Sequence, residues 1–254
     1  MKNIVEVRGL KLGEGMPKIC VPLVGKTNEQ IIEEAEFLKT LKLDLVEWRV
    51  DHYEHVEDLE KVKDILEKLR NTVGELPILF TFRSKKEGGE REVSTEFYSV
   101  LNKEIASTKM ADLIDVELFT GDEIVKDIVD FAHNNGVKVV MSNHDFDKTP
   151  AKEDIVSRLC KMQELKADLP KIAVMPQSSK DVLTLLSATD EMVTEHAKSP
   201  IITMSMGGLG LVSRLAGETF GSALTFGAAK MASAPGQIAV QDLNEVLSLM
   251  HKSK

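Results

Sequence analysis

The sequence of 254 residues has few cysteines, few aromatic side chains and no long apolar run. Its 2 cysteines, Cys20 and Cys160, form neither a CxxC pair nor a disulfide framework, so we expect both to be reduced. No apolar run has the length of a membrane span, and the N-terminal stretch MKNIVEVRGL lacks the apolar core of a signal peptide. These absences predict a cytoplasmic protein with no membrane partner.

Runs of positive charge are also missing. The formal net charge is -9, and no cluster of lysine and arginine interrupts the acidic sequence, which argues against nucleic acid as a partner. A small anion can still be bound by local arginines inside an acidic protein. The 43% hydrophobic content over this length is enough for a sizeable core.

Apolar, strand-like runs alternate with amphipathic helical stretches at fairly even intervals, without a Pro/Gly/Ser-rich linker. The expected strands cover residues 18–25, 43–50, 77–83, 113–118, 137–144, 169–175, 200–206 and 223–229. The stretches TNEQIIEEAEFLKTL and TPAKEDIVSRLCKMQEL each begin with a threonine that can cap a helix, Thr27 and Thr149. This alternation is typical of a protein built from βα units.

Eight βα units in about 250 residues predict one (β/α)8 barrel domain, here residues 1–254. The N-terminal piece VEVRGLKLGEG has a turn-like centre and predicts a β-hairpin that closes the bottom of the barrel. A doubly wound open sheet is the competing fold. It is disfavoured because no GxGxxG follows an early strand and because the units reach eight.

One lysine, Lys171, lies in the otherwise uncharged run LPKIAVMPQS. Burial among such neighbours favours the neutral amine, which can attack a carbonyl. Lys171, Ala173 and Met175 alternate along the strand and should share one face. A second run, VKVVMSNHDF, carries His144 near its C-terminal end. An exposed strand lysine and a lone histidine without a role are the more ordinary interpretations, so the pair is a hypothesis.

Other polar residues are expected at the C-terminal strand ends and in the loops after them, where barrel enzymes carry their chemistry. They are Glu47 and Arg49 at the end of the second strand, Arg83 at the tip of the third and Glu87 in the Gly-rich loop after it, Arg214 in the loop GGLGLVSR, and Ser233 and Gln237 in the last loop, KMASAPGQ. Structural alternatives exist for several of them. Glu47 and Arg49 can form a plain ion pair, and GGLGLVSR can bind a phosphate.

Several residues have no assigned role in chemistry. Met204, Met206 and Phe226 are expected to pack, although a site can use them as its dry wall. No function is assigned to the histidines in helices and polar loops, which are His52, His55, His133, His196 and His251.

The segments EWRVD, FTFRSKKEGGE, SNHDF, LPKIAVMPQ and FGSALTFGAAKMASAPGQ follow one another over essentially the whole chain. In this order and spacing they closely resemble the type I 3-dehydroquinate dehydratase family of the shikimate pathway. The resemblance implies a (β/α)8 barrel, usually a homodimer, that converts 3-dehydroquinate to 3-dehydroshikimate. It also implies that neither a metal nor a nucleotide cofactor takes part.

The resemblance further implies a role for each matching residue. Lys171 would be the Schiff-base lysine, His144 the proton-transfer residue and Glu87 the carboxylate that holds this histidine. Arg214 and Gln237 would bind the substrate carboxylate, and the residues that hold the hydroxyls and close the site would be Glu47, Arg49, Arg83 and Ser233.

The residue types suit this chemistry independently. The substrate is a β-hydroxy ketone, and an iminium at Lys171 would accept electrons as the proton leaves the carbon beside it. His144 can take and return that proton because imidazole titrates near neutral pH. Nearby arginines and burial are both expected to favour the free amine of Lys171.

Three alternatives remain open from the sequence. An aldolase would use the same lysine to break a carbon-carbon bond. A metal enzyme would use Glu47, Glu117 and His144 as ligands. A barrel can also bind a small molecule without turning it over, since fold alone does not fix function.

Overall fold

The computed structural model describes residues 4–229 and 233–253. Residues 230–232, in the predicted loop KMASAPGQ, lie outside this range, as do the ends of the predicted domain, residues 1–3 and 254. Among the described residues, no helix is both long and apolar enough to cross a membrane.

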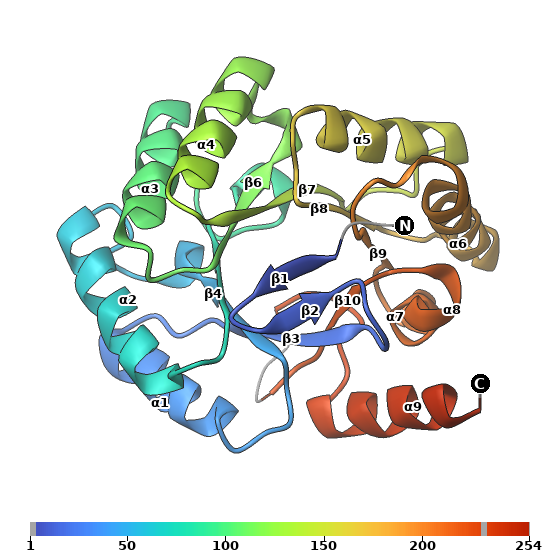
Figure 1. Cartoon of the computed structure of the whole chain (residues 1–254), viewed down its shortest axis with the longest axis horizontal. Helices are drawn as coiled ribbons and strands as arrows, with labels where there is room; N and C mark the ends of the chain where they lie inside the picture. Colours follow the sequence, from blue (N-terminus) through green and yellow to red (C-terminus); the bar gives the residue numbers. More distant parts are fainter. Residues whose placement is uncertain (1–3, 230–232, 254) are drawn as a thin grey trace.

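Eight parallel strands form a nearly closed barrel with helices around it (Figure 1). The strands are β3 (Lys18–Leu23), β4 (Leu45–Arg49), β5 (Ile78–Thr81), β6 (Leu113–Glu117), β7 (Lys138–Asp145), β8 (Leu169–Val174), β9 (Ile202–Ser205) and β10 (Leu224–Phe226). Their order is β10-β3-β4-β5-β6-β7-β8-β9, and a parallel bridge between Ile201 and Ser222 joins the two ends. The predicted (β/α)8 barrel is confirmed, and the open sheet is wrong.

The helices cover the outside of the barrel. They are α1 (Asn28–Leu38), α2 (Leu59–Val73), α3 (Thr95–Thr108), α4 (Asp122–Asn134), α5 (Lys152–Glu164), α6 (Ser179–Glu191), α7 (Leu211–Leu215), α8 (Gly217–Phe220) and α9 (Val240–Lys252). The threonine cap of α1 is confirmed, because Thr27 Oγ1 accepts a hydrogen bond from Gln30 N. The second threonine cap is wrong: α5 begins after Ala151, and Thr149 Oγ1 donates to the Met175 carbonyl.

Several strands are shorter than predicted, and short helical turns follow β4 and β6 directly. The chain after β4 turns into the 3-10 helix η1 (Val50–His52), and η3 (Leu118–Thr120) follows β6. After β5 the chain forms η2 (Lys85–Glu87), and α6 continues into the π-helical turn η4 (Met192–His196). The turns η1, η2 and η3 bend the chain at the C-terminal edge of the barrel, whereas η4 follows α6 and precedes β9.

The N-terminal hairpin closes the bottom of the barrel as predicted. Strands β1 (Val5–Val7) and β2 (Leu10–Leu12) pair antiparallel, and Figure 1 shows them across the centre of the ring of helices. The two-residue turn has positive φ at both Arg8 and Gly9, which matches the twist of a hairpin. Val5, Val7 and Leu12 pack into the barrel interior.

Three aspartates fix the pairing of neighbouring strands at the bottom. Asp44 accepts a hydrogen bond from Ile19 N at 2.7 Å. Asp112 binds Ile78 N at 2.9 Å in the same way, and Asp168 binds Val139 N at 2.8 Å. Each aspartate precedes one strand and binds the backbone of its neighbour. The carboxylates therefore satisfy N–H groups near the strand starts, where the register is set.

The barrel interior consists of two different layers. The lower layer is apolar and packs on the hairpin; it contains Cys20, Leu45, Leu79, Leu113, Val140, Leu169, Ile202 and Leu224. Two residues further along five of these strands, buried polar side chains follow: Glu47, Thr81, Asp115, Ser142 and Lys171. Since side chains alternate along a strand, both sets point inward. The polar layer forms the floor of the site.

Candidate active site

A pocket at the C-terminal end of the barrel brings together all nine site residues predicted from the sequence. Its lining includes Glu47, Arg49, Arg83, Glu87, His144, Lys171, Arg214, Ser233 and Gln237. Ala173, Met204, Met206, Phe146 and Phe226 supply an apolar wall. The pocket therefore combines charged groups from most of the strands with one dry side.

Lys171 lies in the middle of β8 and is only 3% exposed. Its Nζ is 3.4 Å from Asp115 Oδ2, 3.9 Å from Glu47 Oε1 and 4.6 Å from the centre of the Phe226 ring. The expected alternation is confirmed, since Ala173 and Met175 belong to the interior cluster. The sequence predicted arginines near this amine but not the two carboxylates that flank it, Asp115 and Glu47.

Asp115 is fully buried on β6 and was not singled out from the sequence. Its Oδ1 accepts a hydrogen bond from Ser142 Oγ at 2.6 Å, and its Oδ2 forms an ion pair with Arg83 Nη2 at 2.7 Å. Burial opposes ionisation, but the nearby Arg83 and Lys171 hold the pKa of Asp115 below its ordinary value. Asp115 is therefore a carboxylate that is fixed from several sides.

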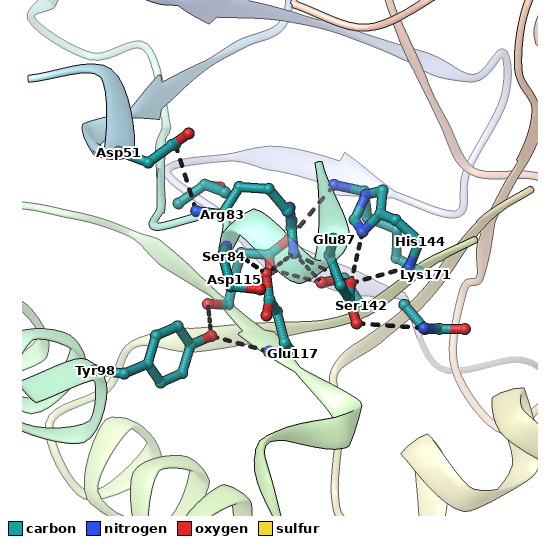
Figure 2. Close-up of polar contacts among 12 residues, drawn as sticks. Asp51, Arg83, Ser84, Glu87, Tyr98, Asp115, Glu117, Ser142, His144 and Lys171 are labelled. Carbon is teal, nitrogen blue, oxygen red and sulfur yellow. Dashed lines mark hydrogen bonds and ion pairs between the residues drawn. The ribbon is translucent and has the colours of Figure 1, made fainter. Parts of the chain in front are cut away.

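His144 lies near the end of β7 beside Glu87, as the resemblance implied (Figure 2). Its Nδ1 and its backbone N are each 2.9 Å from Glu87 Oε2. Asn143 Nδ2 donates to Glu87 Oε1 at 3.2 Å. These bonds orient the imidazole and leave Nε2 for a ligand in the pocket.

The pKa values of this pair move in opposite directions. Burial, with Arg83 and Lys171 adding to it, lowers the pKa of His144 well below its ordinary value. Burial and the neighbouring Glu117 raise the pKa of Glu87 to about 8, against the effect of Arg83. Burial thus disfavours the charged form of both partners.

The glycines after Glu87 are required by close packing. Gly88 has φ of +85°, and a Cβ there would lie 2.3 Å from the Phe146 ring. A Cβ on Gly89 would lie 1.8 Å from the carbonyl oxygen of Arg83. Only glycine allows the chain to fold back here and aim Glu87 at His144.

Arg83 connects the polar layer to the pocket. Its Nη1 donates to Glu117 Oε1 at 2.9 Å and to Ser142 Oγ at 2.8 Å, and it lies 3.6 Å from Glu87 Oε2. Figure 2 shows this guanidinium among the carboxylates of Asp115, Glu117 and Glu87. Arg83 therefore holds several carboxylates in place in a region shielded from water.

The structural alternative for Glu47 and Arg49, a direct ion pair, is wrong. Arg49 donates two hydrogen bonds of 2.8 Å to Asp51, a buried residue of η1 that the sequence did not single out. Glu47 accepts from Thr81 Oγ1 at 2.9 Å. Asp51 came into reach because the chain turns into η1 directly after β4.

Arg214 lies in α7 and is only 2% exposed. Its Nη2 donates to the Pro235 carbonyl at 3.0 Å, whereas its buried Nε has no hydrogen-bond partner among the described residues. Burial lowers the pKa of Arg214 to about 10. A desolvated guanidinium at a pocket wall is suited to bind an anionic group of a ligand.

Ser233 and Gln237 lie at the mouth of the pocket and bind each other. Ser233 N donates to Gln237 Oε1 at 2.9 Å, and Gln237 Nε2 donates to Ser233 Oγ at 3.1 Å. The same loop contacts the loop after β9, because Gly207 N donates to the Pro235 carbonyl at 3.2 Å. Both predicted residues thus reach the pocket from one loop.

The metal-binding alternative finds no support in the geometry. Within residues 4–229 and 233–253, no three His, Cys, Asp or Glu side chains are grouped as a metal site requires. Glu117, one of the proposed ligands, accepts instead from Arg83 Nη1 and from Ser84 N, each at 2.9 Å. His144 uses Nδ1 for Glu87.

Comparison with known proteins gives the family. The family model described as type I 3-dehydroquinase matches residues 19–254. This chain belongs to the type I 3-dehydroquinase family. A 3-dehydroquinate dehydratase of Clostridium botulinum is 63% identical over 253 residues, covering 100% of both chains. That of Listeria innocua is 64% identical over 250 residues, covering 98% of this chain and 99% of the relative.

Solved structures of 3-dehydroquinate dehydratases agree with the fold. The crystal structure of type I 3-dehydroquinate dehydratase from Clostridium difficile with covalent modified comenic acid has a TM-score of 0.98. It is 61% identical to this chain, and the match covers 100% of each. A 3-dehydroquinate dehydratase from Geobacillus kaustophilus has a TM-score of 0.96 at 40% identity, covering 98% of this chain and 97% of the other.

Proposed function

We propose that this hydro-lyase of the shikimate pathway dehydrates 3-dehydroquinate to 3-dehydroshikimate through an imine at Lys171. The observation that carries the mechanism is the presence of a buried amine and a largely buried imidazole in one pocket, those of Lys171 and His144, the imidazole being 11% exposed. Family membership supplies the substrate. The relative solved with covalent modified comenic acid gives further support for a covalent route.

The first step joins Lys171 Nζ to the ketone carbon of the substrate and releases water. The resulting iminium keeps one positive charge on nitrogen and withdraws electrons from the adjacent carbon. His144 then removes a proton from that carbon and leaves an enamine. General base catalysis of this kind typically contributes about 100-fold to 10,000-fold.

The second step expels the hydroxyl group of the enamine. His144 returns the proton to this hydroxyl, which leaves as water, and the nitrogen regains its positive charge in a conjugated iminium. Water then hydrolyses this iminium and frees both Lys171 and the enone product. Glu87 supports both proton transfers, because the 2.9 Å hydrogen bond between its Oε2 and His144 Nδ1 fixes the orientation of the ring.

The remaining pocket residues hold the substrate in this proposal. Arg214 and Gln237 bind the substrate carboxylate, for which the desolvated guanidinium is suited. The hydroxyls are bound by the other predicted residues, which are Glu47, Arg49, Arg83 and Ser233. Arg49 and Arg83 are already held by carboxylates and are therefore preorganised donors.

The proposal extends to the state of the protein in the cell. We expect residues 1–254 to act as one barrel domain in a cytoplasmic homodimer, with the small-molecule substrate and neither nucleic acid nor membrane as a partner. The net charge of -9 supports the absence of nucleic acid.

The test is to incubate the protein with 3-dehydroquinate and borohydride and to map the reduced adduct by peptide mass spectrometry. We expect the adduct on Lys171 and the enone product in the untreated control. The matched variant Lys171→Met should give neither product nor adduct, because it keeps the volume and loses the amine. Product without an adduct would overturn the imine. The absence of both in the wild type would favour an aldolase or a binding protein.

A further inference from the structure

The polar layer contains one carboxylate that touches the reactive amine without reaching the pocket. Asp115 is 0% exposed and is absent from the pocket lining, whereas Lys171 and Glu47 both line the pocket. Its Oδ2 is 3.4 Å from Lys171 Nζ, closer than the 3.9 Å of Glu47 Oε1. Asp115 therefore approaches the amine from below, on the side away from a bound substrate.

We propose that Asp115 is the counter-ion of the iminium that forms at Lys171. This inference rests on the proposed imine mechanism and adds a residue to it. The amine, the ketone and one proton give an iminium and water, so a positive charge appears on Nζ when the imine forms and again when the hydroxyl leaves the enamine. A carboxylate fixed beside that nitrogen stabilises this charge without rearranging.

The neighbours of Asp115 keep it fixed in this position. Ser142 Oγ donates to Oδ1 at 2.6 Å, and Arg83 Nη2 lies 2.7 Å from Oδ2. Ser142 is paired in register with Lys171 on the adjacent strand, so the donor and the amine belong to one rung of the barrel. The carboxylate cannot rotate away from Nζ without losing these bonds.

The matched control is Glu117, two residues further along the same strand. It binds Nη1 of the same guanidinium, that of Arg83, at 2.9 Å. Among the described residues its ion pair is with Arg83, whereas Asp115 pairs with both Arg83 and Lys171. Asp115→Asn and Glu117→Gln thus each remove one buried carboxylate from the Arg83 network. Only the first removes the partner of Lys171.

The experiment measures kcat, KM and the fraction of enzyme trapped by borohydride at saturating 3-dehydroquinate. We expect Asp115→Asn to lower kcat by about 100-fold, as for the loss of one preorganised charged group, and to lower the trapped fraction. KM should change by less than about threefold, because Asp115 lies outside the pocket. Glu117→Gln should keep the wild-type trapped fraction.

Two results would overturn the inference while leaving the imine mechanism intact. The first is wild-type kcat and trapping in Asp115→Asn, and the second is an equal loss of trapping in Glu117→Gln. No adduct in the wild type would instead remove the imine proposal itself. If Asp115→Asn does not fold, Ser142→Ala tests the same contact: kcat should fall by about tenfold, and an unchanged kcat would count against the counter-ion.

Discussion

Two layers of the barrel interior lie only two residues apart and differ in chemistry. Along five strands an apolar side chain is followed by a polar one, in the pairs Leu45 and Glu47, Leu79 and Thr81, Leu113 and Asp115, Val140 and Ser142, and Leu169 and Lys171. Along β9 and β10 both inward layers stay apolar, from Ile202 to Met204 and from Leu224 to Phe226. The barrel strands thus supply a packed lower layer and, above it, a charged site with one dry wall.

The difference shows where stability and function reside. The lower layer buries apolar surface against the hairpin, which is the dominant favourable contribution to folding. The polar layer buries charges, whose desolvation offsets most of their mutual attraction. The raised pKa of Glu87, beside this layer, shows the same cost of burying a charge, since burial and Glu117 oppose its ionisation. We therefore expect substitutions in the two layers to have different consequences.

The largest expected change in stability follows from Leu113→Ala in the lower layer. Leu113 is fully buried between the hairpin and the polar layer, so the variant should lose about 3 kcal/mol of unfolding free energy. At a temperature where it is still folded, kcat should stay within about twofold, because the polar layer is unchanged. Urea unfolding and steady-state kinetics measure the two effects.

The control for Leu113→Ala is Leu183→Ala on α6. Leu183 is 65% exposed, so its truncation should change the unfolding free energy by less than about 0.5 kcal/mol. Equal losses in both variants would mean that the lower layer does not carry the stability.

Much of this organisation could be predicted from the sequence. The eight strands were visible because parallel strands buried on both faces form apolar runs of regular spacing. All nine predicted residues line one pocket, since most of them stand near a strand end or in the segment after it, and Lys171 reaches the pocket from within β8. The hairpin was visible from its turn-like centre around Gly9.

The missed residues depended on contacts between strands. Asp115 stands within the run LIDVEL, and it could have been found because it shares the inward face with Glu117 two residues later. The pair of Arg49 with Asp51 arises from the turn η1, which no local pattern indicated. The charged surroundings of Lys171 likewise come from β4 and β6, far from β8 in the sequence.

A second prediction concerns the dry wall and its buried cation. Arg214→Ala should raise KM by about 10-fold to 100-fold, the value of a hydrogen bond to a charged group, while kcat changes less. The ligand-free protein should not lose stability, because the variant removes a desolvated charge whose pKa burial lowers to about 10. Kinetics and urea unfolding without ligand test both parts.

Arg214→Lys is the matched variant for this position. It keeps the positive charge but loses the planar fork, so its KM should lie between those of Arg214→Ala and the wild type. An unchanged KM in Arg214→Ala would show that the carboxylate binds elsewhere.

The smallest expected effect is a pH dependence of stability that comes from Glu87 and His144, which lie above the polar layer. Glu87 keeps its proton in the folded protein up to about pH 8, whereas its ordinary pKa is 4.5, so stability should fall as pH rises between these values. The lowered pKa of His144 has the opposite effect below 6.5, because only the unfolded protein then binds the proton. The two effects oppose each other up to pH 6.5, and a net decrease should remain from there to about pH 8.

Urea unfolding of the wild type and of Glu87→Gln between pH 6.5 and about 8 measures this decrease. One proton limits the wild-type slope to about 1.4 kcal/mol per pH unit. Glu87→Gln should show a flatter profile, because glutamine resembles the protonated acid and does not titrate. A wild-type profile as flat as that of the variant would mean that Glu87 is already ionised in the folded protein. The charged network around Arg83 would then offset the burial of this carboxylate, and the polar layer would hold its charges at less cost than the comparison of the two layers implies.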